Sequence, residues 1–209
     1  PMTALIVVPL ANIETTWQKL LMKCGGGDNA AGVCRSWEEF KAMGKGRYRT
    51  LLLHYEALRG KMIQKIIKQR WTLVVYDESQ RLKARGSKQS RASARFKDVR
   101  HRVLLSGTPI EQSPLDLWAQ FRFACPQVLG TVWSTFVDKW CDRKGYMGHE
   151  LVFRKHMLEE FLSLIEPHIL RVKKEDVLDL PPMEIKHVPV VLLGEQRSEE
   201  HTSELQSRS

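Results

Sequence analysis

Two adjacent carboxylates, Asp77 and Glu78, follow an apolar run at residues 71–76 and are the residues best suited to do chemistry in this chain. Placing two like charges side by side at the end of a buried strand is costly unless a cation or a reacting group uses them. In phosphoryl transfer, an acid at such a position holds Mg²⁺, usually through water, and its neighbour can orient and deprotonate the attacking water. The alternative is that the two acids only begin a solvated loop, and the dipeptide alone favours that alternative.

The carboxylates belong to a pattern of strands and helices that predicts an α/β fold. Four apolar runs of four to six residues have the length and composition of strands buried on both faces. These runs lie at residues 4–8, 50–53, 71–76 and 102–105, and helical patterns lie between them at 13–22, 36–43, 57–69 and 89–96. This alternation is typical of a parallel sheet with crossover helices.

Polar or turn-forming residues follow every predicted strand. Pro9 follows the first strand, His54 the second, Asp77 the third and Ser106 the fourth. Ligands of an open parallel sheet bind at the carboxyl ends of its strands, so this edge is the candidate active face.

Several segments resemble the motifs of one protein family. Residues 74–83 (VVYDESQRLK) resemble motif II of the helicase-like ATPases of superfamily two, and the Arg-Leu-Lys continuation is similar to the Swi/Snf-like branch. Residues 102–110 with 114–118 resemble that branch's motif III. Motif Ia is similar to residues 5–10 with Trp17, motif Ib to residues 52–56, and the segment that closes the first lobe to 169–177 with 180–182. The resemblance spans residues 3 to about 193 in the family's order and is closest to viral and bacterial members.

The resemblance implies the first RecA-like lobe of a P-loop NTPase that hydrolyses ATP with Mg²⁺ and translocates along double-stranded DNA. A second RecA-like lobe of the same polypeptide would bind the other side of the ATP. Asp77 is then expected to coordinate Mg²⁺ through water, and Glu78 to act as the catalytic base. The other implied site residues are Gln80 beside the ATP site, Ser106, Gly107 and Thr108 as coupling residues, and Pro9, His54 and Tyr55 near the tracked DNA strand.

The sequence also departs from the family pattern. Gln80 stands where the family usually has the His that links the ATP site to motif III, and an amide can donate and accept hydrogen bonds but cannot carry charge. Ala84 and Val172 replace a frequent Asn and a frequent Arg. The chain has no GxxxxGK[ST] phosphate loop, and it lacks the second lobe with the arginine that completes the site. The 209 residues alone are therefore predicted not to hydrolyse ATP.

A cationic segment follows the two carboxylates. Residues 81–102 hold nine Lys and Arg against one acid, Asp98. Lys88, Arg91 and Arg95 share one face if their segment is a helix. A solvated helix face is the ordinary interpretation of such a run, but the imbalance directly after Glu78 favours contact with DNA phosphates. The candidate nucleic-acid contacts in this segment are Arg81, Lys83, Lys88, Arg91 and Arg95.

The chain divides into four predicted segments. Residues 1–124 form the RecA-like lobe, whose first strand and phosphate loop are missing, and 125–180 form a helical extension with patterns at 132–140 and 153–165. A helical pattern at 115–123 closes the lobe. Residues 181–196 are a linker and strand leading toward the absent second lobe. Residues 197–209 lack apolar periodicity and resemble a translated sequencing adapter, so we interpret them as a non-native tail on a fragment of a longer reading frame.

Composition narrows the class of protein without naming a partner. The chain has 33 Lys and Arg against 24 Asp and Glu, a net charge of +9, which predicts attraction to polyanions. No apolar run is long enough for a membrane span, and the four cysteines are too widely spaced for a zinc or redox pair. We therefore expect a protein without a membrane partner in the cytoplasm of a bacterium or an infected host cell, with the nucleus not excluded.

Two other functions stay open. A non-catalytic nucleic-acid-binding or scaffold protein with a degenerate helicase fold is favoured by the missing phosphate loop and Gln80, and disfavoured by the retained Asp77 and Glu78. An RNA helicase of the same superfamily would be stimulated more by A-form duplex than by DNA.

Overall fold

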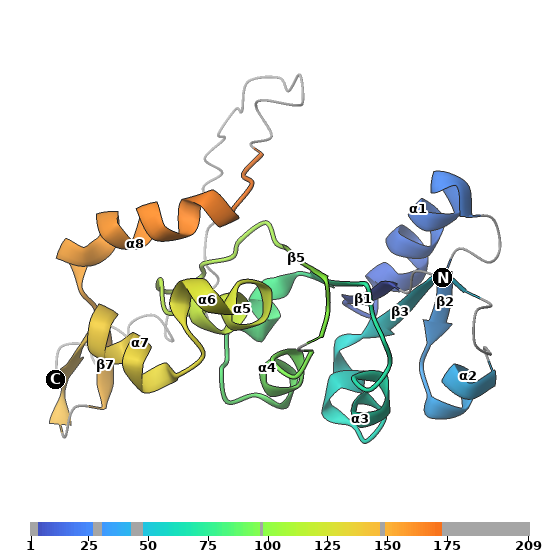
Figure 1. Cartoon of the computed structure of the whole chain (residues 1–209), viewed down its shortest axis with the longest axis horizontal. Coiled ribbons are helices and arrows are strands. Elements are labelled where there is room, and N and C mark those ends of the chain that lie inside the picture. The colour runs from blue at the N-terminus through green and yellow to red at the C-terminus, as the bar shows by residue number, and fades with distance from the viewer. Residues whose placement is uncertain (1–3, 27–30, 43–47, 97, 147–148, 173–209) are drawn as a thin grey trace, which may run out of the picture. The chain divides into compact units, whose positions relative to one another are not determined.

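Five parallel strands form the main sheet in the computed structural model, which describes residues 4–26, 31–42, 48–96, 98–146 and 149–172 (Figure 1). The strands are β1 (Ala4–Val8), β2 (Ala31–Cys34), β3 (Thr50–His54), β4 (Leu73–Asp77) and β5 (His101–Leu105). Their order across the sheet is β2–β3–β1–β4–β5, and every neighbouring pair is parallel. The predicted α/β fold with a parallel sheet is confirmed.

The central strand β1 shows why the apolar runs were informative. All five of its residues are buried. Leu5 and Val7 belong to a hydrophobic cluster on one face of the sheet, whereas Ile6 and Val8 belong to a cluster on the other face. A strand covered on both faces needs a continuous apolar run, because neither set of alternating side chains reaches water.

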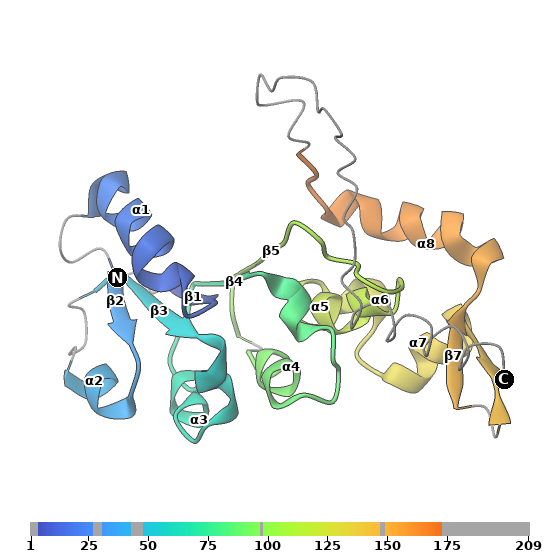
Figure 2. The ribbon, with the colours of Figure 1, turned by 180° about the vertical axis from the view of Figure 1, so that it is seen from behind.

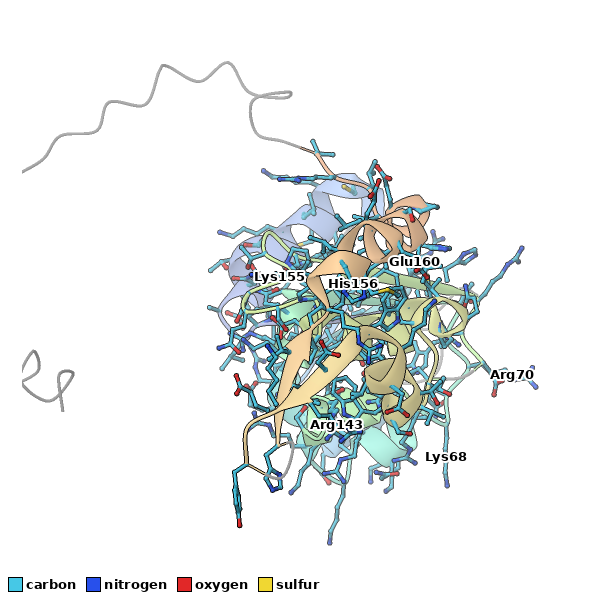
Figure 3. All side chains as sticks on the ribbon, turned by 90° about the vertical axis from the view of Figure 1, so that its left-hand side faces the viewer. Lys68, Arg70, Arg143, Lys155, His156 and Glu160 are labelled. Atoms are coloured by element: carbon cyan, nitrogen blue, oxygen red, sulfur yellow. The ribbon has the colours of Figure 1, made fainter. Side chains whose placement is uncertain are left out.

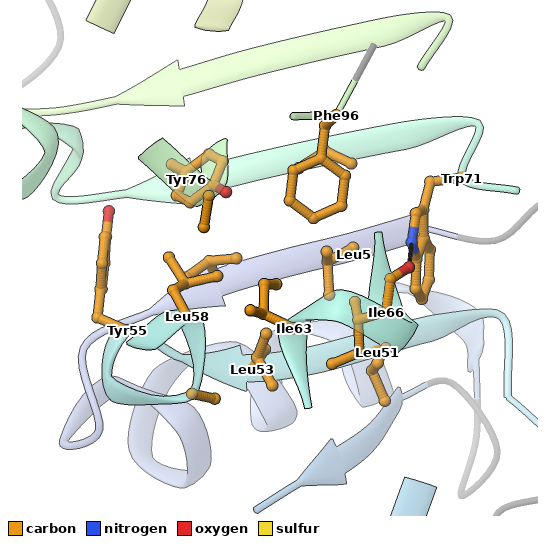
Figure 4. Close-up of a cluster of buried hydrophobic side chains, with 14 of the residues drawn as sticks. Leu5, Leu51, Leu53, Tyr55, Leu58, Ile63, Ile66, Trp71, Tyr76 and Phe96 are labelled. Atoms are coloured by element: carbon orange, nitrogen blue, oxygen red, sulfur yellow. Dashed lines mark hydrogen bonds between the residues drawn. The ribbon is translucent and has the colours of Figure 1, made fainter. Parts of the chain in front are cut away.

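Helical segments cover both faces of the sheet. On the face of Leu5, the 3₁₀ turn Tyr55–Arg59, α3 (Ile63–Ile66) and α4 (Lys88–Ser93) contribute side chains to the cluster drawn in Figure 4. On the other face, a helix runs from the π-helical turn Ile13–Gln18 through α1 (Lys19–Leu21) to a second π-helical turn, Met22–Gly26. Figures 1 and 2 show α1 and α3 on opposite sides of the sheet from two directions.

A capping box at residues 36–39 begins α2 (Trp37–Ala42). The N–H of Glu39 donates to Ser36 Oγ at 3.1 Å, and the Glu39 carboxylate accepts the N–H of Arg35 at 2.7 Å. Each side chain therefore satisfies a backbone donor at a helix start, where the first N–H groups have no partner within the helix.

Two strands differ from the prediction. β2 was not predicted, because its sequence Ala-Gly-Val-Cys is short and only weakly apolar. β5 was expected to be buried on both faces, but it alternates between exposed and half-buried residues, and Val103 and Leu105 are exposed. In the part of the chain that the structure describes, β5 pairs only with β4, so it is an edge strand and lacks the cover of a central one.

Two helices are shorter than predicted. The helical pattern at 57–69 divides at Gly60 into the 3₁₀ turn Tyr55–Arg59 and α3. The pattern at 89–96 forms α4, which ends at Ser93. Arg95 therefore lies beyond the helix, and the predicted face shared by Lys88, Arg91 and Arg95 is not formed.

The segment after β5 builds a second cluster of buried side chains. Trp118, Phe136, Trp140 and Phe161 belong to its centre, and their rings pack mainly edge to face or tilted. The elements are α5 (Asp116–Ala124), α6 (Pro126–Leu129), α7 (Trp133–Trp140), β6 (Cys141–Lys144), β7 (Glu150–Phe153), the 3₁₀ turns Lys155–Met157 and Glu166–His168, and α8 (Leu158–Ile165). The antiparallel hairpin of β6 and β7 was not predicted. The helix expected at 153–165 begins only at Leu158, after the end of β7 and the 3₁₀ turn Lys155–Met157.

The described residues up to Ile169 belong to one compact unit. The predicted boundaries at 124, 180 and 196 stay predictions, and the linker and tail at 181–209 lie outside the described residues. Among the described helices, none is long and apolar enough to cross a membrane.

Candidate active site

The parallel register brings the ends of β1, β3, β4 and β5 to one edge of the sheet. Asp77 is the last residue of β4 and pairs with Leu105, the residue before Ser106. His54 is the last residue of β3, and Pro9 directly follows β1. The structure thus places the predicted site residues at the ends of adjacent strands, as the topology requires.

Donors from the segment after β1 hold the Asp77 carboxylate. The indole Nε1–H of Trp17 donates to Asp77 Oδ2 at 2.8 Å, and Asn12 Nδ2 donates to the same oxygen at 3.4 Å. The N–H of Glu78 donates to Asp77 Oδ1 at 3.1 Å. Sequence reasoning assigned no role at this carboxylate to Trp17 or Asn12, although both follow the first strand closely.

Glu78 adopts a left-handed backbone conformation, with φ 52° and ψ 52°. Among the described residues it is the only residue other than glycine with a positive φ. This conformation costs an L residue about 1–2 kcal/mol, and it persists only where the surroundings hold it. Such strain at a half-buried carboxylate is typical of functional positions.

Gln80 connects Glu78 to the loop after β5. Its Nε2 donates to Glu78 Oε2 at 2.8 Å, and its Oε1 accepts the hydroxyl of Ser106 at 2.7 Å. Ser106 Oγ in turn accepts the N–H of Thr108 at 3.0 Å. The result is a continuous path of hydrogen bonds from the carboxylate to the loop, and an amide provides both the donor and the acceptor that it needs.

Gly107 lies between these two loop residues without a steric reason to be glycine. A Cβ built there meets nothing within 4 Å, and its φ is not in the left-handed range. In this conformation, the loop is held by the side chain of Ser106 and not by a close approach of the backbone.

A second buried contact fixes the same loop. Ser79 Oγ donates to Gln120 Oε1 at 2.8 Å, and Gln120 Nε2 donates to the carbonyl oxygens of Pro109 at 2.7 Å and Asp116 at 3.1 Å. Gln120 is 2% exposed, which is unusual for an amide on a helix face packed into a core. Sequence reasoning missed both Ser79 and Gln120, and the only available signal was a polar residue among the apolar positions of α5.

Tyr55 and Pro9 are expected to lie near the tracked DNA strand, and that position stays a prediction. Both are buried, and Tyr55 is 0% exposed. The Tyr55 hydroxyl lies 2.7 Å from the carbonyl oxygen of Asp77 and 3.3 Å from that of Glu78. Burial, followed by the charge of Asp77, raises the pKa of this phenol, so it stays a hydrogen-bond donor. His54 is half-buried, and its Nδ1 lies 3.1 Å from Glu56 Oε2.

The basic residues predicted to contact DNA differ in exposure and in the contacts that their side chains already make within the chain. Lys83 forms an ion pair with Glu111, which raises the pKa of the lysine. Arg81 is exposed, with its guanidinium 5.6 Å from the centre of the Tyr55 ring. Arg91 donates to the carbonyl oxygen of Gly86 at 2.6 and 3.0 Å. Lys88, Arg91 and Arg95 are all exposed.

The residues of this edge suit one half of a nucleotide site. Asp77 offers a half-buried carboxylate with ordered donors around it, and carboxylate oxygens with water are the ligands that Mg²⁺ prefers. The described residues contain no group of three or more His, Cys, Asp or Glu that could enclose a metal ion without substrate. Water and phosphate oxygens would therefore have to complete the metal shell.

Comparison with known proteins identifies the family. The profile described as SNF2-related domain matches residues 2–207. This chain belongs to the SNF2-related family. Members of the SNF2 family are DNA-dependent ATPases with a helicase-like P-loop NTPase fold, and the family implies the use of a nucleotide and Mg²⁺.

Individual SNF2 proteins support the assignment. The chain is 34% identical over 113 residues to human SWI/SNF-related matrix-associated actin-dependent regulator of chromatin subfamily A member 1, covering 54% of this chain and 10% of the relative. It is 33% identical over 138 residues to Zorya protein ZorD of Escherichia coli, covering 66% of this chain and 12% of the relative. The SNF2 chain described here thus spans about a tenth of the length of these relatives.

The fold matches a solved SNF2 structure as well. The Sulfolobus solfataricus SWI2/SNF2 ATPase core in complex with dsDNA superimposes with a TM-score of 0.68 and 27% identity, covering 86% of this chain and 36% of that chain. The five-stranded parallel sheet with its flanking helices is therefore the RecA-like fold of the SNF2 ATPase core.

Proposed function

We propose that this chain supplies the first RecA-like lobe of an enzyme that hydrolyses ATP to move along double-stranded DNA. The observation that carries the proposal is the hydrogen-bonded path from Glu78 through Gln80 to Ser106. It joins the predicted catalytic base to the predicted coupling loop, which is what an ATPase that moves on DNA requires of this lobe.

Each carboxylate has a separate task in this proposal. Asp77 would hold Mg²⁺ through water, and the ion would supply positive charge against the phosphates. Glu78 accepts a proton from the attacking water, while Gln80 fixes the direction in which its carboxylate points. The phosphate loop and the arginine of the second lobe come from outside these 209 residues.

The proposed DNA contacts follow from exposure and charge. Arg81, Lys88, Arg91 and Arg95 are exposed in a segment with a large excess of positive charge, and the similar archaeal structure contains dsDNA. Lys83 contributes less, because Glu111 already neutralises it. Such contacts fix position on the duplex and carry no sequence information.

Glu78→Gln in a protein that contains this chain, a phosphate loop and the second lobe tests the proposed base. We expect ATP and DNA affinity to stay within about twofold and ATP turnover to fall by at least about 100-fold, because the amide cannot accept the proton. Turnover is measured by phosphate release with saturating DNA.

Glu159→Gln, the same change at an exposed position of α8, is the matched control and should behave as wild type. Turnover at the wild-type rate in Glu78→Gln would refute the role of Glu78.

Gln80, which stands where the resemblance leads one to expect His, supports a second candidate, a non-catalytic DNA-binding protein with this fold. A reading frame that contains this chain but no GK[ST] signature, together with DNA binding and no ATP turnover, would support it over the enzyme. Stronger stimulation by A-form RNA duplex than by DNA would instead indicate an RNA-directed ATPase.

A further inference from the structure

The Tyr55 hydroxyl is placed against the backbone of the two catalytic candidates. It lies 2.7 Å from the carbonyl oxygen of Asp77 and 3.3 Å from that of Glu78, so its single proton is shared between them. The β1–β4 register ends at Tyr76, one residue before Asp77. Tyr55 thus supplies a donor where the ladder with β1 has stopped.

The same peptide units carry the strained conformation of Glu78. A left-handed glutamate persists only when its neighbours hold both of its peptide groups. The Glu78 N–H is bound to its neighbour's Oδ1, and the Glu78 carbonyl oxygen accepts the N–H of Arg81 at 3.1 Å. The Tyr55 hydroxyl contacts the backbone of this turn from the end of another strand, β3, so it ties the turn to the sheet.

Tyr55 is itself held firmly enough to act as a support. Its side chain is fully buried in the cluster of Figure 4, and its ring lies 6.0 Å from that of Tyr76. Gln89 Nε2 donates to its carbonyl oxygen at 3.3 Å from α4. The Arg81 guanidinium also lies over its ring.

We propose that Tyr55 is a positioning residue for the Asp77–Glu78 pair, holding the left-handed turn so that both carboxylates keep their catalytic direction. The proposal rests on the proposed ATPase function for its kinetic consequence, but its structural consequence is independent of it. Tyr55 directly follows His54, so a predicted DNA-contacting residue and the support of the catalytic pair are neighbours in the chain.

Tyr55→Phe in the complete ATPase removes one hydroxyl and leaves the ring. We expect kcat for ATP to fall by about five- to tenfold with the KM for ATP changed by less than about twofold, because the lost hydrogen bond acts on the reacting geometry and not on nucleotide binding. A fall in stability alone would not produce this split between kcat and KM in the folded enzyme.

Tyr76→Phe is a matched control, because it deletes the same atom from a neighbouring ring in the same cluster. Tyr76 is fully buried, and its hydroxyl has no hydrogen-bond partner in the described part of the chain. Its removal should leave kcat and KM unchanged. Equal kinetics for the two variants would overturn the proposal.

Hydrogen exchange in the same proteins separates this proposal from the proposed function. We expect the amides of Glu78 and Arg81 to exchange about fivefold faster in Tyr55→Phe than in Tyr76→Phe, since the turn loses its contact with the sheet. If the wild type hydrolyses no ATP, the proposed function fails, and the hydrogen-exchange comparison alone then tests the role of Tyr55. Equal exchange in both variants then rejects the role of Tyr55.

Discussion

At the scale of single residues, the amide of Gln80 has only one orientation that suits both of its neighbours. The nitrogen faces the Glu78 carboxylate and the oxygen faces the Ser106 hydroxyl. Reversing the amide would place its oxygen against the carboxylate, and two acceptors cannot form a hydrogen bond. Gln80 therefore keeps the path intact without gaining or losing a proton itself.

Gln80→His should make the path depend on pH. A neutral imidazole donates with one nitrogen and accepts with the other, as the amide does, but an imidazolium only donates. We expect the ratio of variant to wild-type kcat to be near one at about pH 8 and to fall as the pH drops toward about 6.5, where an imidazole gains its proton. The neighbouring carboxylate favours the cation, so it moves this loss to higher pH.

The control for this variant is Gln80→Ala, whose ratio to wild type should be low at every pH. The measurement is kcat across the pH range under saturating ATP and DNA. A ratio for Gln80→His that does not change with pH would mean that residue 80 does not accept from Ser106 during turnover.

Sequence was informative about residues whose chemistry is unusual and uninformative about residues that support them. Asp77 and Glu78 could be found because two adjacent acids after an apolar strand have few structural explanations. The family resemblance placed Tyr55 near the tracked DNA strand and did not predict that its side chain is buried. Its burial depends on α4 and β4 packing around it, which no local pattern contains.

At the scale of elements, Arg122 joins α5 to α4. Its Nη2 donates to the carbonyl oxygen and the hydroxyl of Ser90, both at 3.0 Å, and its guanidinium lies 4.7 Å from the centre of the Trp118 ring. Burial, together with the nearby charge of Arg85, lowers the pKa of Arg122. Arg122 therefore links α4 and α5, whose facing surfaces are partly polar.

Arg122→Leu should destabilise the fold by about 1–3 kcal/mol, because the buried Ser90 loses a charge-assisted donor while the packing against Trp118 is roughly kept. Urea unfolding followed by tryptophan fluorescence measures the change. Arg95→Leu, at an exposed position nearby, should change the free energy of unfolding by less than about 0.5 kcal/mol. Equal losses of unfolding free energy in Arg122→Leu and Arg95→Leu would contradict the link that Arg122 makes between the two helices.

The elements also show which patterns carry information. β1 and β4 were predicted because a strand buried on both faces needs apolar side chains at nearly every position, which gives a continuous apolar run in the sequence. β2 and the β6–β7 hairpin were not predicted, because each of their strands has only four residues and those of β6 are mostly polar. The helix expected at 57–69 divides at Gly60. This glycine is visible in the sequence, but whether it ends a helix depends on how α3 packs.

At the scale of the whole molecule, positive charge is concentrated in one part of the chain. Residues 81–102 hold nine basic side chains and one acid, whereas the whole chain has a net charge of +9. Other cations, such as Lys68, Arg70, Arg143 and Lys155, are exposed elsewhere on the molecule (Figure 3). A test of DNA binding must therefore separate the position of a charge from the sum of all charges.

Charge reversal at Arg91 and Arg95 should weaken binding to duplexes of any sequence and reduce its dependence on salt. Each lost phosphate contact lowers the slope of log K against log salt by about 0.9. Fluorescence anisotropy at several salt concentrations measures both quantities. As a control, Arg143→Glu with Lys155→Glu makes the same change in net charge at exposed positions outside the segment. Equal slopes of log K against log salt for the two double variants would mean that residues 81–102 form an ordinary solvated surface and do not contact DNA phosphates.

The open edge of β5 has a consequence for how this chain behaves in concentrated solution. A strand edge that pairs with no further strand among the described residues, together with the exposed Val103 and Leu105, is the geometry from which intermolecular sheets grow. The exposed Arg100 stands directly before that edge, so two copies meeting there bring like charges together. Repulsion between these charges therefore opposes association of two copies at this edge. Salt screens the repulsion, so it should favour association.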